Sequence, residues 1–112
     1  MGYAKIEDRW PYKNLAFISV CLGKNFKKRV YQAAKKLFWM GTSMSDRESV
    51  HETIDDFVEK IGRDAELSST LREDLWQALR QIAIDGLELR QSPRLTYEQL
   101  QESRDYLDKM SR

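Results

Sequence analysis

The sequence predicts an all-α protein, a single-domain bundle of four to five helices, from three observations. Only five Gly and two Pro occur in 112 residues, which argues against a turn-rich β protein. Apolar residues make up 41% and charged residues 33%, a balance that argues against disorder. Apolar side chains also recur at helical spacing along most of the chain. A chain of this length is expected to form one domain over residues 1–112.

The first expected helix covers residues 12–22. Its apolar run is too short to cross a membrane and shows no cleavage pattern of a signal peptide, so no contact with membranes is expected. The run could instead be a buried strand, but no second strand exists to pair with it, which favours helix. The lone cysteine, Cys21, lies in this run and is expected to be a small buried side chain. A single cysteine cannot form an intrachain disulfide, which points to a cytoplasmic protein.

The later helices are expected over residues 25–40, 46–61, 71–90 and 97–110 because start and stop signals alternate along the chain. Capping boxes of the form S/T-x-x-E/Q mark three starts: Ser45 with Glu48, Thr70 with Glu73, and Thr96 with Gln99. Stop signals are Gly41, Gly62 and the pair Ser92-Pro93.

Helical phase indicates how these helices pack. Helix 71–90 is apolar over about half of its circumference, so it is expected at the centre of the bundle. Helix 97–110 carries only a narrow apolar stripe and is expected on the outside. Helix 46–61 is sharply amphipathic, with an acidic stripe opposite its apolar face. This acidic stripe is the predicted protein interface, and it consists of Glu48, Glu52, Asp55, Asp56 and Glu59.

Charge is sorted along the chain. The first 44 residues carry nine Lys/Arg against two Asp/Glu, a balance of +7, whereas residues 45–89 carry five against twelve, a balance of −7. The net charge of +1 therefore conceals a dipolar molecule. Such asymmetry is typical of proteins that bind nucleic acid or an acidic partner.

The segment 24–40 carries six basic residues and no acidic one. Its expected core stripe is Phe26, Val30, Ala33 and Leu37. The aromatic side chains of Tyr31, Phe38 and Trp39 fall among the lysines instead, and cations beside aromatic rings suit phosphate neutralisation and base stacking. The predicted contacts to nucleic acid are Lys24, Lys27, Lys28, Arg29, Tyr31, Lys35, Lys36 and Trp39. A structural alternative is that Phe38 and Trp39 pack under the N-terminal segment or in an oligomer interface, while the lysines are simply solvated.

A helix-turn-helix interpretation fails on charge, because the second helix, 46–61, would turn five carboxylates towards the phosphates that flank a major groove. If nucleic acid binds, the basic helix is expected to contact its backbone or a single-stranded segment, with little sequence preference.

Catalytic signatures are weak. His51 and Asp55 lie four residues apart on one helical face with Glu52 beside them, but a third metal ligand is missing. A magnesium-dependent nucleotide pyrophosphatase of the all-α type is a minor alternative. Its expected pattern, E-x-x-E followed by E-x-x-D, does not appear, and the available pairs are Glu52/Asp55 and the reversed Asp85/Glu88. We therefore expect no enzyme activity, cofactor or metal.

The sequence thus predicts a small, non-catalytic accessory subunit that binds nucleic acid backbone through its basic helix. It is expected to self-associate or to dock into a nucleoprotein complex. The main alternative is a protein-only adaptor or inhibitor that uses the acidic stripe and exposed aromatic residues.

Overall fold

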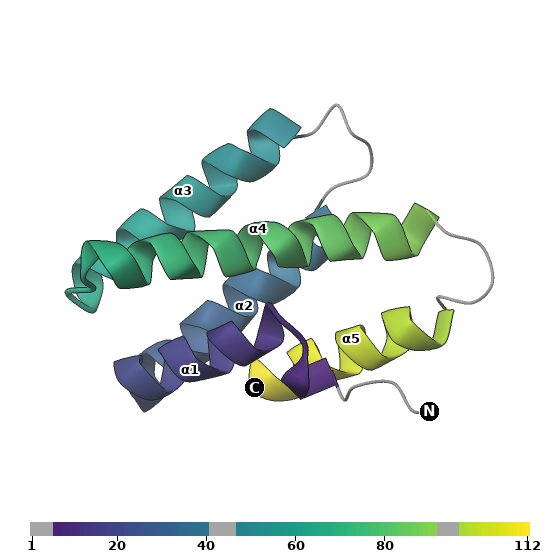
Figure 1. Cartoon of the computed structure of the whole chain (residues 1–112), viewed down its shortest axis with the longest axis horizontal. Coiled ribbons are helices and arrows are strands. Elements are labelled where there is room, and N and C mark those ends of the chain that lie inside the picture. Colours follow the sequence, from purple (N-terminus) through teal and green to yellow (C-terminus); the bar gives the residue numbers. More distant parts are fainter. Residues whose placement is uncertain (1–5, 41–46, 92–96) are drawn as a thin grey trace.

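The computed structural model of the chain describes residues 6–40, 47–91 and 97–112, and at residues 47, 48, 89–91 and 97 it describes the backbone alone. These residues form a short 3₁₀ helix and five α-helices, which confirms the all-α class. The elements are η1 (Ile6–Asp8), α1 (Tyr12–Leu22), α2 (Lys24–Met40), α3 (Arg47–Asp64), α4 (Ser69–Gln91) and α5 (Tyr97–Met110) (Figure 1). Within this part of the chain, no helix is both long enough and apolar enough to span a bilayer.

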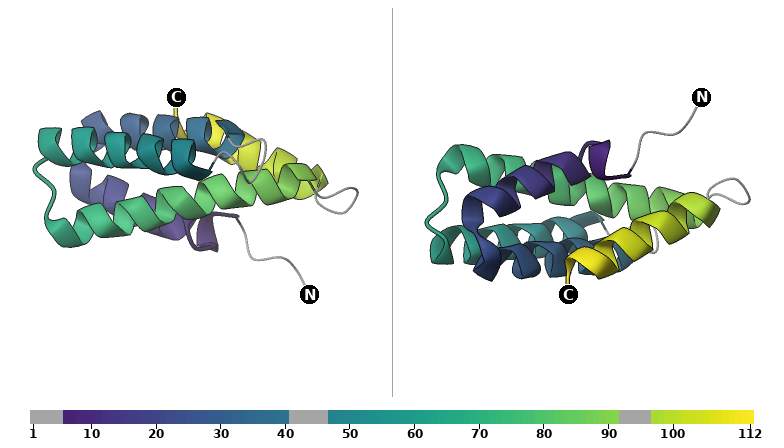
Figure 2. Two further views of the ribbon diagram at one scale, coloured as in Figure 1. Left: turned by 90° about the horizontal axis from the view of Figure 1, so that it is seen from above. Right: turned by 90° about the horizontal axis from the view of Figure 1, so that it is seen from below.

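Helices α2 and α4 form the centre of the bundle. Each contacts the other and also contacts α1, α3 and α5. Figure 1 and the two views of Figure 2 show α3 and α1 on opposite sides of this pair, with α5 beside the C-terminal half of α4. The prediction that the fourth helix is central is confirmed, but it shares that place with the basic helix. The basic helix therefore has neighbours on several sides.

The crossing of α2 and α4 depends on Gly86. A Cβ atom built at Gly86 would lie 2.0 Å from the backbone oxygen of Phe38. Only glycine permits two helix backbones to approach this closely. Around the crossing, the side chains of Leu37, Leu79 and Ile82 are fully buried.

The turn between α3 and α4 differs from its prediction. Gly62 was expected to end the third helix, but α3 continues to Asp64 and Gly62 is buried within it. Arg72 of α4 packs over Gly62 and donates hydrogen bonds from Nη2 to the Gly62 carbonyl at 3.2 Å and from Nε to the Leu67 carbonyl at 3.1 Å. The missing side chain of Gly62 thus makes room for Arg72 instead of ending the helix.

The N-terminus of α4 is also capped by a residue other than the predicted one. The Ser68 hydroxyl accepts a hydrogen bond from the backbone N–H of Leu71 at 3.2 Å, so the helix starts two residues before the predicted Thr70 box. The boxes at Ser45 and Thr96 lie outside the described residues.

Helix α1 packs on the central pair with Tyr12, Leu15, Ile18 and Ser19 buried. Cys21 lies on its opposite face and is exposed, which corrects the prediction of a buried cysteine. An apolar run of eight residues is longer than the buried arc of one helix, so some of its members must face outward. Phe17 and Val20 share this outer face with Cys21 and are also exposed.

Candidate nucleic-acid interface

The buried face of α2 is wider than predicted. Val30, Ala33 and Leu37 are buried as expected, whereas Phe26 is only half-buried. Tyr31 and Phe38, which were expected among the exposed lysines, are each 0% exposed. The reason is that α5 and α4 cover the flanks of α2, so that its buried arc includes residues next to the expected stripe. Tyr31 therefore cannot stack on a nucleic-acid base.

Tyr31 instead belongs to a cluster of aromatic rings between α1, α2 and α5. The ring of Tyr106 meets Tyr12 edge to face at 5.5 Å and Tyr31 at 6.2 Å between centroids. The hydroxyls of Tyr12, Tyr31 and Ser19 are buried without a hydrogen bond of standard geometry. Burial raises the pKa of Tyr12 to about 12, partly offset by the neighbouring Ser103, and burial also raises the pKa of Tyr31. Tyr12 and Tyr31 therefore stay uncharged, and the cluster has a structural role.

The basic residues of α2 fall on three different sides of the helix. Lys24 and Lys27 lie beside α1, where they line a hollow together with residues of that helix. Arg29 turns towards α3 and forms a 2.9 Å salt bridge with Asp64, and it also lies over the Phe26 ring. Lys28 and Lys35 face α5. Lys36 lies between α5 and α3, with its ammonium 5.7 Å from the centre of the Phe57 ring.

The cations that face α5 line an open groove of about 730 Å³, which we call the basic groove. Its lining residues are Lys28, Gln32, Lys35, Lys36 and Trp39 of α2 together with Asp108, Ser111 and Arg112 at the end of α5. At about 100° per residue, the α2 members fall within about 100° of one another around the axis, so they form one stripe along the helix. The right-hand view of Figure 2 shows the last turn of α5 lying alongside α2. Four cations thus surround the groove, against one carboxylate.

Arg112 and Gln32 line the groove but are not among the residues predicted to contact nucleic acid. Arg112 lies eighty-four positions after Lys28 in the printed sequence, and no local pattern links the two. The position of Gln32 could have been predicted from the sequence, because it lies four residues from both Lys28 and Lys36 on the same helical face. Only the packing of α5 on α2 brings Arg112 to the groove.

The carboxylate of the groove is Asp108, which forms a salt bridge with Lys35. This contact lowers the pKa of Asp108, with smaller contributions from Arg104 and Arg112. The side chain of Lys35 remains 45% exposed. Lys35 therefore starts with part of its charge compensated, while Lys28 and Lys36 are exposed cations.

Trp39 lies at one end of the basic groove and is 38% exposed. Its ring meets the buried Phe38 ring edge to face at 5.2 Å between centroids, which holds it against the bundle. A partly exposed indole on a rigid support beside cations has the chemistry that base stacking uses. Of the three aromatic residues predicted near the lysines, Trp39 keeps an exposed surface.

The acidic stripe on α3 is largely exposed, as its phase predicts, but two of its members have partners. Asp55 accepts a hydrogen bond from the indole N–H of Trp76 at 2.7 Å, and Asp56 forms a 3.1 Å salt bridge with Lys60. Glu52 and Glu59 are exposed. The side chain of Glu48 lies outside the described residues. The stripe is therefore a carboxylate surface that is partly tied to its own bundle.

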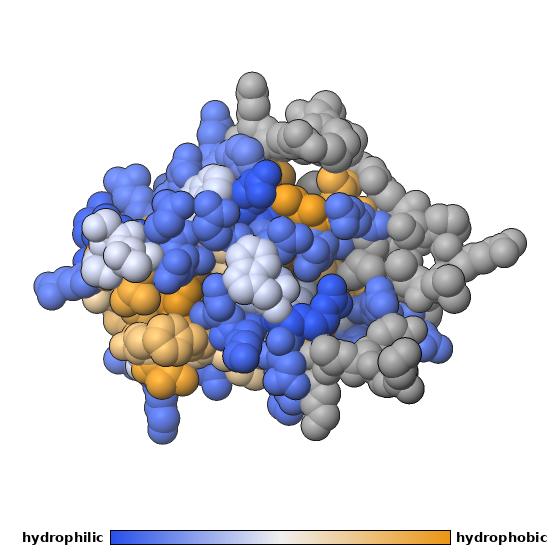
Figure 3. Space-filling view, viewed as in Figure 1, coloured by the Kyte–Doolittle hydropathy of each residue, from blue (hydrophilic) through white to orange (hydrophobic). Residues whose placement is uncertain are grey.

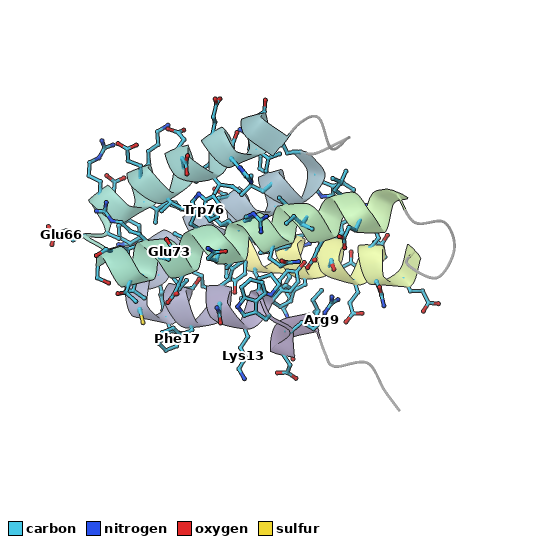
Figure 4. All side chains as sticks on the ribbon, turned by 45° about the horizontal axis from the view of Figure 1, so that its top comes forward. Arg9, Lys13, Phe17, Glu66, Glu73 and Trp76 are labelled. Carbon is cyan, nitrogen blue, oxygen red and sulfur yellow. The ribbon has the colours of Figure 1, made fainter. Side chains whose placement is uncertain are left out.

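The possible metal pair on α3 has a different role in the structure. The His51 ring packs at 5.6 Å on the Trp76 ring, tilted by 51°, while Asp55 binds the indole N–H of the same tryptophan. In the described part of the chain, no three His, Cys, Asp or Glu residues gather closely enough to hold a metal ion. His51 and Asp55 thus both position Trp76, which Figure 4 labels on α4 facing α3.

Comparisons with protein-family models, with curated proteins and with solved structures find no match to this chain. The fold and the site alone define the class of this protein, which is an all-α helical bundle with a basic groove between its second and fifth α-helices.

Proposed function

We propose that this chain is a small, non-catalytic accessory subunit that binds the backbone of single-stranded nucleic acid in the basic groove, with little sequence preference. The observation that supports it is the gathering of Lys28, Lys35, Lys36 and Arg112 around one groove that ends at Trp39. Phosphates provide the negative charge that these cations attract, and a base next to them can stack on the indole. Because these contacts do not read base edges, they give affinity without sequence specificity.

The groove suits one strand better than a duplex. Lys28, Lys35 and Lys36 lie along one face of α2 and Arg112 joins them from the end of α5, so the positive charge is confined to one groove that a single phosphate backbone can follow. Stacking on Trp39 also needs an unpaired base. We therefore expect single strands to bind more tightly than duplexes of the same length.

The test is fluorescence anisotropy of a labelled oligothymidine, and of a matched duplex, titrated with the full chain across a salt series. If four cations neutralise phosphates, the slope of log K against log salt is about −3 for a single strand. Reversing two cations of the groove, Lys28→Glu with Lys36→Glu, should abolish binding at moderate salt. Trp39→Ala should weaken it by about 1–3 kcal/mol if the indole stacks on a base.

The matched control is Lys24→Glu with Lys27→Glu. It changes the net charge by the same amount on the same helix, but both residues face α1 and lie outside the groove lining. The proposal requires this control to bind much more tightly than the groove variant. Equal losses in the two variants would show a diffuse charge effect without a groove, and no binding at low salt would overturn the proposal.

The adaptor alternative makes a different prediction with the same protein. If the acidic stripe binds a basic protein surface, including the basic groove of a second copy, then Glu52→Lys with Asp56→Lys should disrupt that contact. Sedimentation at rising protein concentration measures self-association directly. The adaptor alternative would be favoured if the chain forms a salt-sensitive assembly that these two changes remove and if it binds no oligonucleotide.

A further inference from the structure

The outer face of α1 carries a second surface, which we call the α1 patch and define by Lys13, Phe17, Val20 and Cys21. Phe17 is 64% exposed and Val20 is 82% exposed. Figure 3 shows an apolar area at the lower left, where α1 lies, and Figure 4 shows Phe17 and Lys13 pointing away from the bundle. Large exposed apolar side chains that lie together are typical of an interaction surface, and the basic groove does not use this one.

A hollow of about 290 Å³ adjoins the patch. Ala16 and Val20 of α1 and Met110 of α5 provide apolar walls, and Lys24 and Lys27 of α2 lie along its edge. Its lining also includes Ser19 and Tyr31, which are buried. A ridge of exposed apolar side chains beside an apolar hollow can bind the apolar stripe of an amphipathic helix, with one side chain of that helix inserted into the hollow.

The charges around this surface select the partner. Helix α1 contains no acidic residue, and the cations beside the patch and the hollow are Lys13, Lys24 and Lys27. Lysines near both ends of this surface favour a partner that has carboxylates beside its apolar residues. We propose that the α1 patch and its hollow dock an amphipathic helix of another protein, with an apolar stripe flanked by Asp and Glu. This inference goes beyond nucleic-acid binding and does not depend on it.

A second copy of this chain fits the surface less well. Among the side chains that the structure describes, the large exposed apolar ones are Trp10, Phe17, Val20 and Trp39. None of these lies on the acidic α3, so that helix offers no apolar centre for the patch. Two α1 patches facing each other would bring lysines of both copies together, which is unfavourable.

A lipid surface is also a poorer match. The hollow is concave and accepts a discrete side chain, whereas a bilayer receives protruding residues along a flat plane. Glu7 and Asp8 are exposed in η1, immediately before α1, and would face the anionic headgroups that lysines attract. A helix that crosses the C-terminal half of α1 avoids these carboxylates.

The probe for this proposal is a capped, fluorescein-labelled peptide of about 18 residues with Leu at helical a and d positions and Glu at most others. Its counterpart replaces every Glu with Lys. With the full chain, we expect the acidic peptide to bind and the basic peptide not to bind. Phe17→Ser with Val20→Ser should weaken binding at least about tenfold. Both residues are exposed, so this variant should fold, and circular dichroism checks that it does.

A dye attached to Cys21 reports the place of binding, since this cysteine is exposed within the patch. Its emission should change when the acidic peptide is added. The groove variant Lys28→Glu with Lys36→Glu should keep peptide binding, and Phe17→Ser with Val20→Ser should keep oligonucleotide binding. The two proposals can therefore fail separately.

Four results would overturn the docking proposal. The first is equal binding of the acidic and basic peptides, and the second is unchanged binding after Phe17→Ser with Val20→Ser. The third is binding of the chain through Phe17 and Val20 to phosphatidylserine vesicles but not to the acidic peptide. The fourth is self-association that the same two changes remove, which would assign the patch to a second copy.

Discussion

Replacing Gly86 with alanine tests the centre of the fold, because this substitution normally stabilises a helix. At an open helical position, alanine is more favourable than glycine by about 1 kcal/mol. At Gly86 the new methyl group would lie 2.0 Å from the backbone oxygen of Phe38 and 2.8 Å from its carbonyl carbon. The obstacle is the backbone of α2, which cannot rotate away as a side chain could.

The size of the effect follows from this distance. An ordinary contact needs at least 3.4 Å, so the backbones of α2 and α4 would have to separate by about 1.4 Å at the crossing. That separation loosens the packing of Leu37, Leu79 and Ile82, all fully buried. Overpacking of a core costs about 1–3 kcal/mol, occasionally more, and we expect the upper end of this range here. After the gain in helix propensity, Gly86→Ala should lower the free energy of unfolding by about 2 kcal/mol.

Urea unfolding followed by far-UV circular dichroism measures this change, with the same m-value expected for both proteins. Gly62→Ala is the matched control, since its methyl group would meet the Arg72 side chain, which can move, at 2.8 Å. We expect Gly62→Ala to change stability by less than about 1 kcal/mol, because displaced Arg72 hydrogen bonds offset the gain in propensity. A Gly86→Ala protein as stable as the wild type, or more stable, would refute the close crossing of α2 and α4.

Two further predictions concern the turn before α4 and the tyrosine cluster. Ser68→Ala removes the hydroxyl that accepts a hydrogen bond from the Leu71 N–H, so it should lower the free energy of unfolding in urea by about 1 kcal/mol. Thr70→Ala should lower it clearly less. The reverse order would show that Thr70, as the capping box predicts, is the N-cap. The pKa of Tyr12 is raised by burial from 10.0 to about 12, so its neutral form stabilises the folded state fully below pH 10 and this contribution is lost as the pH rises towards 12. Unfolding measured between these pH values should show a steeper loss for the wild type than for Tyr12→Phe, and equal slopes would contradict the burial of this hydroxyl.

Much of the fold could be predicted from local sequence, because apolar spacing and turn residues act over a few positions. The helix bounds agree closely, and α3 carries its acidic stripe as its phase predicts. The predictions fail where the burial of a residue depends on how many helices pack around its own helix. Tyr31 and Phe38 became buried because α2 has helices on several sides, and Cys21 became exposed because α1 is covered on one side.

The candidate site was predictable only in part for the same reason. Sequence alone placed six cations on one helix, but it could not divide them among α1, α3 and α5. Predicting where each cation lies requires knowing which helix covers which side of α2. Arg112 joins Lys28 through tertiary packing, and no local pattern contains that information.

Because Lys27 and Lys28 are consecutive residues of one helix, their side chains leave it about 100° apart around its axis. One lies at the hollow beside α1 and the other at the basic groove beside α5. Helix α2 would thus hold a nucleic-acid strand in the groove and a partner helix on the α1 patch at a fixed angle to each other. Because α2 is also the centre of the bundle, the angle between two bound partners could change only if the packing of the bundle itself changed.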